Sequence, residues 1–248
     1  MLEFRSWRSC SEFVQSVTLQ GRYIREASAD EFLNAVLATS KSRKKTIREQ
    51  SYLWRAQLGC DWNDDGHSDE EPRPFSPKRM KPQANMATEG RANPKGIPYL
   101  YLASDKETAM AEVRPWVGSL ISIGLFRTMR KLVVVDCSAD IQEPTIYLGE
   151  PTPEEREQAV WSDINGAFSM PVSLTDQKAE YVPTQVIAEL FKNNGADGIM
   201  YRSAVGKGLN VVLFDLATAE IVNCFLYEAA ELSFNFGEIA NPYFVRKH

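Results

Sequence analysis

Residues 90–115 read GRANPKGIPYLYLASDKETAMAEVRP, which indicates a loop, a strand and a helix in close succession. The glycines and prolines of the first part indicate the loop. The apolar and aromatic run at 98–103 predicts the strand. Ser104-x-x-Glu107 is a capping-box pattern, so a helix is expected to run from 105 to about 113. Pro115 should end it, because the residue before a proline disfavours helical backbone.

Strand and helix signals continue on both sides of this stretch. Runs of β-branched, aromatic and other apolar residues predict further strands at 52–58, 119–126, 131–136, 198–202, 210–215, 221–227 and 230–236. Pro153 and the two glutamates after it open a helix, and Thr184 is expected to cap another over 185–194. The strands do not alternate regularly with helices, so the predicted fold class is α+β, with a strongly bent or split sheet and flanking helices.

The chain divides into stretches of different composition. Residues 1–48 have helical apolar spacing and are predicted to form an N-terminal helical extension. Within them, Ser28-x-x-Glu31 is a capping-box pattern, and the basic run at 42–45 is expected to be a solvated helix end or loop. Residues 50–248 are predicted to form the main domain, in which 59–96 is a long, partly irregular, acidic and proline-rich loop.

Composition and charge narrow the class of protein. The 248 residues are 44% hydrophobic and 25% charged, as in soluble globular proteins. No apolar run reaches the roughly 18 residues that span a bilayer, and the first residues lack the apolar core of a signal peptide. A cytoplasmic protein without membrane contact is therefore expected. A net charge of −5 gives no overall attraction to a phosphate backbone, so direct nucleic-acid binding is not expected.

A low histidine content restricts the chemistry. The chain has only two histidines, His67 and His248. Serine and cysteine hydrolases usually use a histidine base, and most catalytic zinc sites have two or three histidine ligands. The four cysteines are widely spaced and form no CxxC pair, so no metal site is predicted. Catalysis would have to rest on carboxylates, arginines, tyrosines and hydroxyls.

Two motifs match functional patterns only in part. The stretch 61–66, DWNDDG, matches the opening of a calcium loop, but Pro72 stands where the bidentate glutamate belongs. An acidic surface loop is the better interpretation. Gly206-Lys207-Gly208 lacks the spacing of a phosphate-binding loop and indicates a tight turn between two strands. No GxGxxG motif follows a predicted strand, so a Rossmann-type site is unsupported.

The blocks at 90–115 closely resemble the core signature of the RES domain, a family named for an arginine, a glutamate and a serine. Two later blocks resemble the second half of that family, Tyr181-x-x-Thr184-Gln185-x-x-Ala188-Glu189 and Gly195-x-Asp197-Gly198-Ile199-x-Tyr201-Arg202-Ser203. The resemblance extends from Tyr52 to the end of the sequence. It implies a fold similar to that of ADP-ribosyltransferase toxins.

The resemblance also implies an activity and a partner. RES proteins are toxins of bacterial toxin–antitoxin systems that stop growth by degrading NAD⁺. They break the nicotinamide–ribose bond by phosphorolysis or hydrolysis, so NAD⁺ is a substrate, inorganic phosphate a possible co-substrate, and no other cofactor is implied. The expected partner is a separate antitoxin with a helix-turn-helix domain, and a homodimer is compatible with the resemblance. The loop before Arg91 is longer and more acidic here than in the compact toxins.

The resemblance points to Glu112, Arg91, Tyr101 and Ser203, and the chemistry of the reaction suggests a role for each. Glu112 would stabilise the positive charge that develops on the ribose as neutral nicotinamide leaves, and would polarise the incoming hydroxyl or phosphate. Arg91 would bind the dinucleotide phosphates through its bidentate fork, with Arg55 as a further candidate. Tyr101 would stack on the nicotinamide or ribose face. Ser203 would hydrogen-bond the ribose or support Glu112.

The sequence is also compatible with two other functions. An ADP-ribosyltransferase acting on a protein would also release nicotinamide but would leave a labelled target. The sequence has no obvious Glu-x-Glu pair near Glu112, which weakens the case for arginine modification. A non-catalytic module that binds a nucleotide or a protein is the other alternative. Loss of Glu112 or Arg91 would have supported that function, and both residues are present.

Overall fold

The computed structural model describes residues 3–62, 71–83, 86–139, 147, 149, 151–170, 178–233 and 237. The strands are β1 (Lys44–Ile47), β2 (Tyr52–Leu58), β3 (Asp61–Trp62), β4 (Pro72–Arg73), β5 (Leu100–Ala103), β6 (Leu120–Thr128), β7 (Leu132–Asp136), β8 (Gly198–Arg202), β9 (Leu209–Leu213) and β10 (Ala219–Glu228). The helices are α1 (Ser9–Leu19), α2 (Ala27–Thr39), α3 (Pro77–Met80), α4 (Lys106–Glu112), α5 (Pro153–Ser169) and α6 (Val182–Asn193), with short 3₁₀ turns at Ser40–Arg43, Lys178–Tyr181 and Leu216–Thr218.

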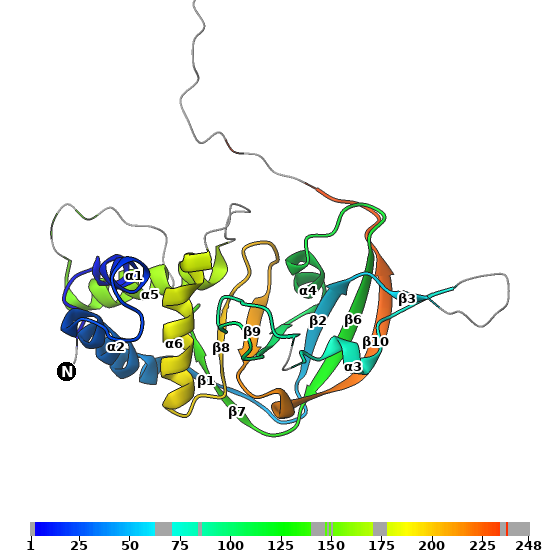
Figure 1. Cartoon of the computed structure of the whole chain (residues 1–248), viewed down its shortest axis with the longest axis horizontal. Helices are drawn as coiled ribbons and strands as arrows, with labels where there is room; N and C mark the ends of the chain where they lie inside the picture. Colours follow the sequence, from blue (N-terminus) through cyan, green and yellow to red (C-terminus); the bar gives the residue numbers. More distant parts are fainter. Residues whose placement is uncertain are drawn as a thin grey trace, which may run out of the picture.

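The main sheet is mixed and has the order β1-β7-β8-β9-β5-β2-β6-β10, while β3 and β4 form a separate short pair. Only β7 and β8 run parallel among the described strand pairs. Helices α1, α2, α5 and α6 gather at the β1–β7–β8 end, and α3 and α4 lie at the other end (Figure 1). The predicted α+β class is confirmed.

The sheet separates into two halves between β5 and β2. These neighbours share a single register pair, Trp54↔Ala103. By contrast, β2 pairs with β6 along Tyr52–Leu58, and β5 pairs with β9 along Leu100–Ala103. Strands that share one pair diverge on either side of it. The expected split of the sheet therefore lies at the point where the candidate residues of β2 and β5 face each other.

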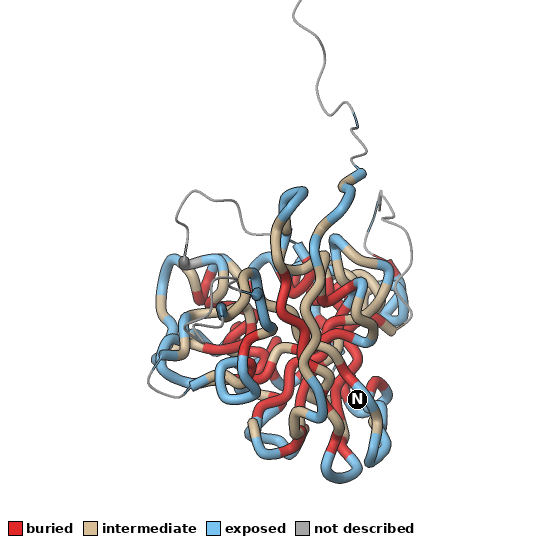
Figure 2. Tube along the Cα trace, turned by 90° about the vertical axis from the view of Figure 1, so that its right-hand side faces the viewer, coloured by how far each residue is buried: buried red, intermediate tan, exposed pale blue. Residues whose placement is uncertain are grey.

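Two apolar clusters pack against the sheet, and alternate residues of β7 and β9 contribute to one or the other. The first cluster joins the helices at one end to the sheet and includes Phe13, Val36, Trp161, Phe168 and Phe191. The second cluster contains residues of α3 and of strands β2, β5, β6, β7 and β9, and it includes the fully buried Met80, Phe126 and Leu132. The buried segments form a continuous interior through the middle of the molecule (Figure 2). Burial of this apolar surface provides the main driving force for folding.

The N-terminal extension is helical as predicted but also contributes a strand. Strand β1 pairs antiparallel with β7 and forms one edge of the main sheet. The expectation of a solvated helix end or loop at 42–45 was correct for Ser42, which is exposed in the 3₁₀ turn after α2, but wrong for Arg43, which is buried, and for Lys44 and Lys45, which are exposed but belong to a strand. The Arg43 guanidinium lies 4.5 Å from the centroid of the buried Trp161 ring, and Lys45 Nζ lies 2.6 Å from the carboxylate of the buried Asp136. The contacts of Arg43 with Trp161 and of Lys45 with Asp136 thus fix this basic segment against the rest of the fold.

Three predicted helix caps were wrong. Helix α2 begins at Ala27 without a side-chain cap from Ser28. Asp105, not Ser104, caps α4, because its carboxylate accepts the backbone N–H of Thr108 at 2.7 Å. Helix α6 begins at Val182, and the Thr184 hydroxyl instead donates to the backbone carbonyl of Arg91. A neighbouring residue replaces the expected cap of α4, and a tertiary contact engages the expected cap of α6.

Two stretches of the main domain differ in detail from prediction. The loop at 59–96 carries the short elements β3, β4 and α3, and the carboxylate of Asp61 there lies 3.2 Å from Arg79. The calcium-like motif otherwise falls outside the described residues, as do His67 and His248. The strand expected at 230–236 is absent over 230–233, where the backbone is irregular, and its remainder lies outside the described residues.

Within the described part of the chain, no helix is long and apolar enough to cross a membrane. The same residues contain no cluster of three histidine, cysteine or acidic side chains that would hold a metal ion.

Candidate active site

Glu112 is the last residue of α4, and its carboxylate is held by two side chains from the other half of the sheet. Oε1 accepts the Ser203 hydroxyl at 2.7 Å and the Asn210 amide Nδ2 at 2.6 Å. Oε2 accepts no hydrogen bond from any described residue. A negative charge at a helix C-terminus is unfavourable, so the two donors offset this and fix the orientation of the group. One oxygen is anchored and the other remains available.

Ser203 supports Glu112 and has little capacity left for another ligand. It follows β8 directly, and its Oγ accepts the backbone N–H groups of Val205 and Gly206 at 3.2 and 2.8 Å while it donates to Glu112. A hydroxyl has one donor and two acceptor positions, and all three are used. Of the two roles predicted for Ser203, the geometry favours support of Glu112 over contact with a ribose.

The turn between β8 and β9 fixes the position of α4. Thr108 Oγ1 accepts the N–H of Gly208 at 2.9 Å, and Ser104 Oγ accepts that of Leu209 at 3.0 Å. A Cβ at Gly208 would lie 2.7 Å from Thr108 Oγ1 and would also collide with the Asp105 carboxylate. The Gly-Lys-Gly motif is thus a tight turn between strands, as predicted. Its close packing on α4 determines where Glu112 lies.

Asn210 is a site residue that the sequence analysis missed. Its register partners are Tyr201 on β8 and Ala103 on β5, and Ala103 in turn pairs with Trp54 on β2. Directly opposed residues point to the same face of a sheet. These four side chains therefore form a row across the split. The only sequence signal for Asn210 is an amide inside an otherwise apolar strand.

This row forms part of a cavity of about 230 Å³. Its lining residues come from β2, β5, α4, β8 and β9 and are Trp54, Arg55, Ala56, Tyr101, Leu102, Ala103, Ala109, Glu112, Val113, Tyr201 and Asn210. The small side chain of Ala103 leaves the space open between Asn210 and Trp54. Glu112 is the only carboxylate among these residues.

Tyr101 borders the cavity and fastens the loop before β5. Its hydroxyl donates to Asn93 Oδ1 at 2.7 Å and accepts the N–H of Ala92 at 3.0 Å. From α6, the amide of Gln185 donates to the backbone carbonyls of Gly90 and Asn93 at 2.9 and 3.1 Å. Burial raises the pKa of Tyr101 and outweighs the opposing effects of these backbone contacts and of Arg91. The phenol therefore stays neutral and acts as a donor at neutral pH.

The structure separates Arg91 from the cavity. Its Nη1 donates to the carbonyls of Phe168 and Ser169 at the end of α5, the latter at 2.7 Å. A cation at this position satisfies carbonyls that have no partner within the helix. Arg91 is not among the residues that line the Glu112 cavity. In this arrangement it fixes the loop against α5, close enough to Tyr101 to affect its pKa.

Arg55 is the cation that lines the cavity. Its Nη1 donates to the Tyr101 carbonyl at 3.2 Å, and its buried Nε has no hydrogen-bond partner among the described residues. No described carboxylate forms an ion pair with it. Desolvation lowers the pKa of Arg55 to about 10, with Tyr101 acting in the opposite direction, so the group is still protonated at neutral pH. An underused buried cation of this kind suits an anionic ligand.

Tyr201 forms the rear of the cavity. Only 3% of it is exposed, and its ring stacks on Phe168 with centroids 5.5 Å apart. Burial raises the pKa of Tyr201, as does the proximity of Tyr101 and Glu112. Its hydroxyl makes no hydrogen bond to another residue in the described part of the chain. The site thus combines one carboxylate, one buried cation and two neutral phenols.

Comparison with known proteins connects this geometry to a family. A family model described as the RES domain matches residues 52–235. Comparison with curated proteins gave no match. Among solved structures, the chain is similar to one in the crystal structure of the M. tuberculosis MbcT-MbcA toxin-antitoxin complex, with 17% identity over 79% of this chain and 93% of that chain. The TM-score of that match is 0.41.

Proposed function

Because this chain belongs to the RES-domain family, we propose that it is an enzyme that breaks the nicotinamide–ribose bond of NAD⁺. One observation carries the proposal. Glu112 lines a cavity with one carboxylate oxygen anchored by Ser203 and Asn210 and the other unbonded among the described residues. This is the arrangement that a reaction through a ribosyl cation requires, since the carboxylate must lie against the reacting carbon without reorienting.

In this reaction, the C–N bond breaks and its electron pair leaves with nicotinamide, which departs as a neutral molecule. The ribose carbon then carries positive charge, which the Glu112 carboxylate stabilises. At about 4 Å and an effective dielectric of about 20, this attraction is roughly 4 kcal/mol before desolvation is counted. No strong general acid is needed for the leaving group. A site without a described histidine is therefore sufficient.

The acceptor attacks the ribose carbon from the open side of the cavity. With inorganic phosphate as acceptor, the products are ADP-ribose-1″-phosphate and nicotinamide. With water, they are ADP-ribose, nicotinamide and a proton, and the unbonded oxygen of Glu112 is positioned to accept that proton. Tyr101 and Tyr201 supply aromatic surface beside the reacting groups.

Arg55 is the residue that the geometry favours for the dinucleotide phosphates. It lines the cavity and has unused donors, whereas Arg91 donates to the carbonyls that end α5. Arg91 then acts as a positioning residue for the loop that holds Tyr101. Both arginines remain necessary for activity, for different physical reasons.

The family resemblance also supports a biological role. We propose that the protein acts as the toxin of a toxin–antitoxin pair, stops growth by depleting NAD⁺, and is inhibited by a separate antitoxin with a helix-turn-helix domain. Expression of the wild type in a bacterial host should arrest growth and lower the cellular NAD⁺ level. The Glu112→Gln variant should do neither at equal expression.

The direct test is release of nicotinamide by the purified full-length protein, with and without phosphate. Glu112→Gln is compared with Glu107→Gln, a change of an exposed glutamate on the same helix. The wild type and Glu107→Gln should release nicotinamide, and Glu112→Gln should not. Intact NAD⁺ with all three proteins would refute the proposal for free NAD⁺. If radiolabelled NAD⁺ instead transfers label to a protein in a lysate, the chain is an ADP-ribosyltransferase.

A further inference from the structure

A second, larger cavity, the outer cavity, adjoins the one that contains Glu112. Its volume is about 590 Å³, and it shares Arg55 and Tyr101 with the Glu112 cavity. Its lining residues include three cations, Arg55, Arg79 and Lys81, and no aspartate or glutamate among the described residues. Clustered cations without a carboxylate create a positive potential that favours a multiply charged anion.

The two additional cations stand on a rigid support. Arg79 and Lys81 flank Met80, which is fully buried. The Arg79 guanidinium lies 3.5 Å from the centroid of the Phe75 ring, and its Nη1 lies 3.2 Å from Asp61. The backbone N–H of Phe75 is fixed in turn by the buried Ser122 hydroxyl of β6 at 2.9 Å.

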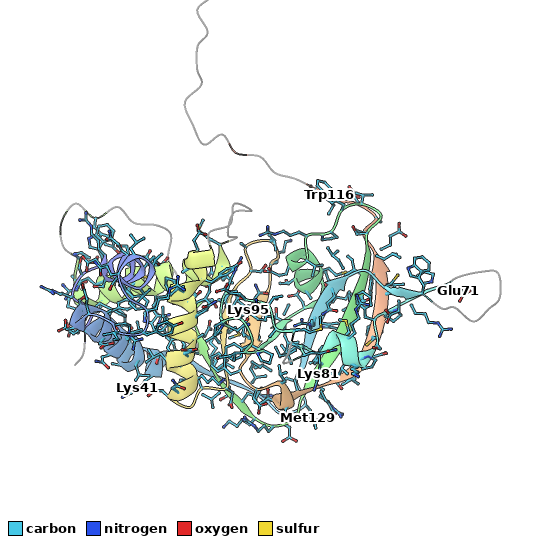
Figure 3. The ribbon with its side chains drawn as sticks, in the orientation of Figure 1. Lys41, Glu71, Lys81, Lys95, Trp116 and Met129 are labelled. Carbon is cyan, nitrogen blue, oxygen red and sulfur yellow. The ribbon has the colours of Figure 1, made fainter. Side chains whose placement is uncertain are left out.

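Lys81 is held less tightly than Arg79. Its Nζ donates to the Leu216 carbonyl at 3.3 Å, and it has no ion-pair partner in the described part of the chain. Figure 3 shows it beside α3, away from Lys41 at the opposite end of the molecule. Arg79 is already positioned and loses little entropy when an anion binds, whereas Lys81 has to be ordered further by the anion.

The number of cations and their distribution over the two cavities indicate the class of ligand. Arg55 lines both cavities and is placed to contact the diphosphate of a dinucleotide whose nicotinamide end lies near Glu112. Arg79 and Lys81 line only the outer cavity, where the adenosine end would lie. A plain adenosine ribose carries no charge, which leaves Lys81 without a counter-charge and Arg79 with only the partly exposed Asp61. A phosphate on that ribose carries about −1.5 to −2 charges at neutral pH and would match them.

The remaining walls of the outer cavity suit a purine. Met86, Pro98 and Tyr99 present apolar and aromatic surface, which packs well against a flat base. We propose that the outer cavity binds adenosine carrying a 2′-phosphate, so that the substrates of the enzyme include NADP⁺. The substrate statement rests on the proposed function, whereas the binding statement can be tested separately.

Binding is measured by calorimetry on the full-length protein with adenosine 2′,5′-bisphosphate and adenosine 5′-monophosphate, which differ only by the 2′-phosphate. The bisphosphate should bind about tenfold or more tightly, as expected for charge-assisted contacts to a phosphate. Arg79→Gln and Lys81→Gln should each reduce this preference, and Lys81→Arg should retain it. Lys41→Gln, an exposed lysine outside the cavity, should leave it unchanged.

Equal affinities for the two nucleotides would overturn the proposal, as would a preference that persists when both Arg79 and Lys81 are changed. A third arm uses inorganic phosphate alone. If it competes as strongly as the bisphosphate, the cavity is a site for free phosphate and the proposal fails. Thermal unfolding of each variant identifies a loss of binding that results from misfolding. If one variant misfolds, the other still tests whether its cation gives the preference for the bisphosphate.

Nicotinamide release from NADP⁺ and NAD⁺ separates this inference from the proposed function. Cleavage of NAD⁺ without a preference for the bisphosphate would overturn the 2′-phosphate site and leave the activity standing. A preference for the bisphosphate without cleavage of either dinucleotide would support the site and refute the activity. If the protein has both the activity and the 2′-phosphate site, Lys81→Gln should lower kcat/KM for NADP⁺ about tenfold more than kcat/KM for NAD⁺.

Discussion

Asn210 Nδ2 lies 2.6 Å from Glu112 Oε1, the same carboxylate oxygen that accepts the Ser203 hydroxyl. The two donors come from the end of β8 and from β9, whereas Glu112 comes from α4. The carboxylate is thus oriented across the sheet by groups that have no charge of their own. The orientation of Glu112 therefore depends on neighbours as much as on its own backbone.

Removal of the Asn210 amide should reduce activity without removing the carboxylate. In Asn210→Ala, Oε1 keeps only the Ser203 hydroxyl, so the carboxylate samples more orientations. We expect kcat for nicotinamide release to fall about 10- to 100-fold with little change in KM, because the interaction positions a group for the transition state. Steady-state kinetics would test this. A change in KM alone, with kcat preserved, would contradict the positioning role.

The close packing at Gly208 predicts that this turn controls both stability and activity. In Gly208→Ala, the new methyl group would meet Ser104 Oγ at 2.5 Å and Thr108 Oγ1 at 2.7 Å, so α4 must shift and move Glu112. We expect a loss of about 1–3 kcal/mol in unfolding free energy together with reduced nicotinamide release. Denaturant unfolding and the activity assay measure the two effects.

Gly166→Ala provides the matched control for this change. Gly166 lies inside α5 with no atom within 4 Å of the added methyl group. This replacement should stabilise the protein by up to about 1 kcal/mol, since alanine favours the helix. Activity should not change. If Gly208→Ala behaved like Gly166→Ala, the turn would not determine the position of α4.

The sequence predicted the elements of the fold better than their ends. Strands such as 52–58 and 198–202 are found as predicted because their apolar patterns reflect burial within the sheet itself. The predicted cap of α6 was wrong because a tertiary contact engages the polar side chain: the Thr184 hydroxyl donates to the Arg91 carbonyl. Strand β1 was not predicted, because two consecutive lysines are typical of a solvated segment. The sequence does not show that Lys45 pairs with the buried Asp136.

The candidate site was predictable only in part. Motifs identified Glu112 and Ser203, and the structure brings them together. Asn210 was missed because strand register is not visible in the sequence, and register alone places it opposite Tyr201 and Ala103. The relative positions of Arg55 and Arg91 depend on the same three-dimensional information. A motif names the residue types of a site, but the pairing of strands decides which of them share a cavity.

The contact between Lys45 and Asp136 predicts a measurable contribution of the N-terminal extension to stability. Asp136 is fully buried, and Lys45 Nζ lies 2.6 Å from its Oδ2. In Lys45→Met, this buried oxygen loses the partner that the ion pair provides, which should lower the unfolding free energy by about 1–3 kcal/mol. Arg25→Met removes the more exposed pair with Asp30 and should cost at most about 1 kcal/mol. Equal effects in denaturant unfolding would show that β1 is not anchored by this contact.

Asp197 should make stability depend on pH in the acidic range. Its carboxylate accepts Arg130 Nη2 at 2.6 Å and the backbone N–H of Val133 at 2.7 Å. Partial burial alone would raise the pKa of Asp197, but these hydrogen bonds and the charge of Arg130 outweigh it and hold the pKa below its usual value. A carboxylate with a lowered pKa in the folded state stabilises the fold fully above its unfolded pKa of about 3.9.

That contribution is lost as the pH falls through the lowered folded pKa, because both states then carry the proton. Asp197→Asn should therefore be less stable than the wild type at pH 7, by about 1.5–3 kcal/mol for bonds to a charged group. The difference should shrink as the pH falls below about 3.9 and disappear below the folded pKa. Urea unfolding of both proteins at several pH values gives this difference directly. A difference that stays constant from neutral to acidic pH would mean that the lost contact is one of packing, not of charge.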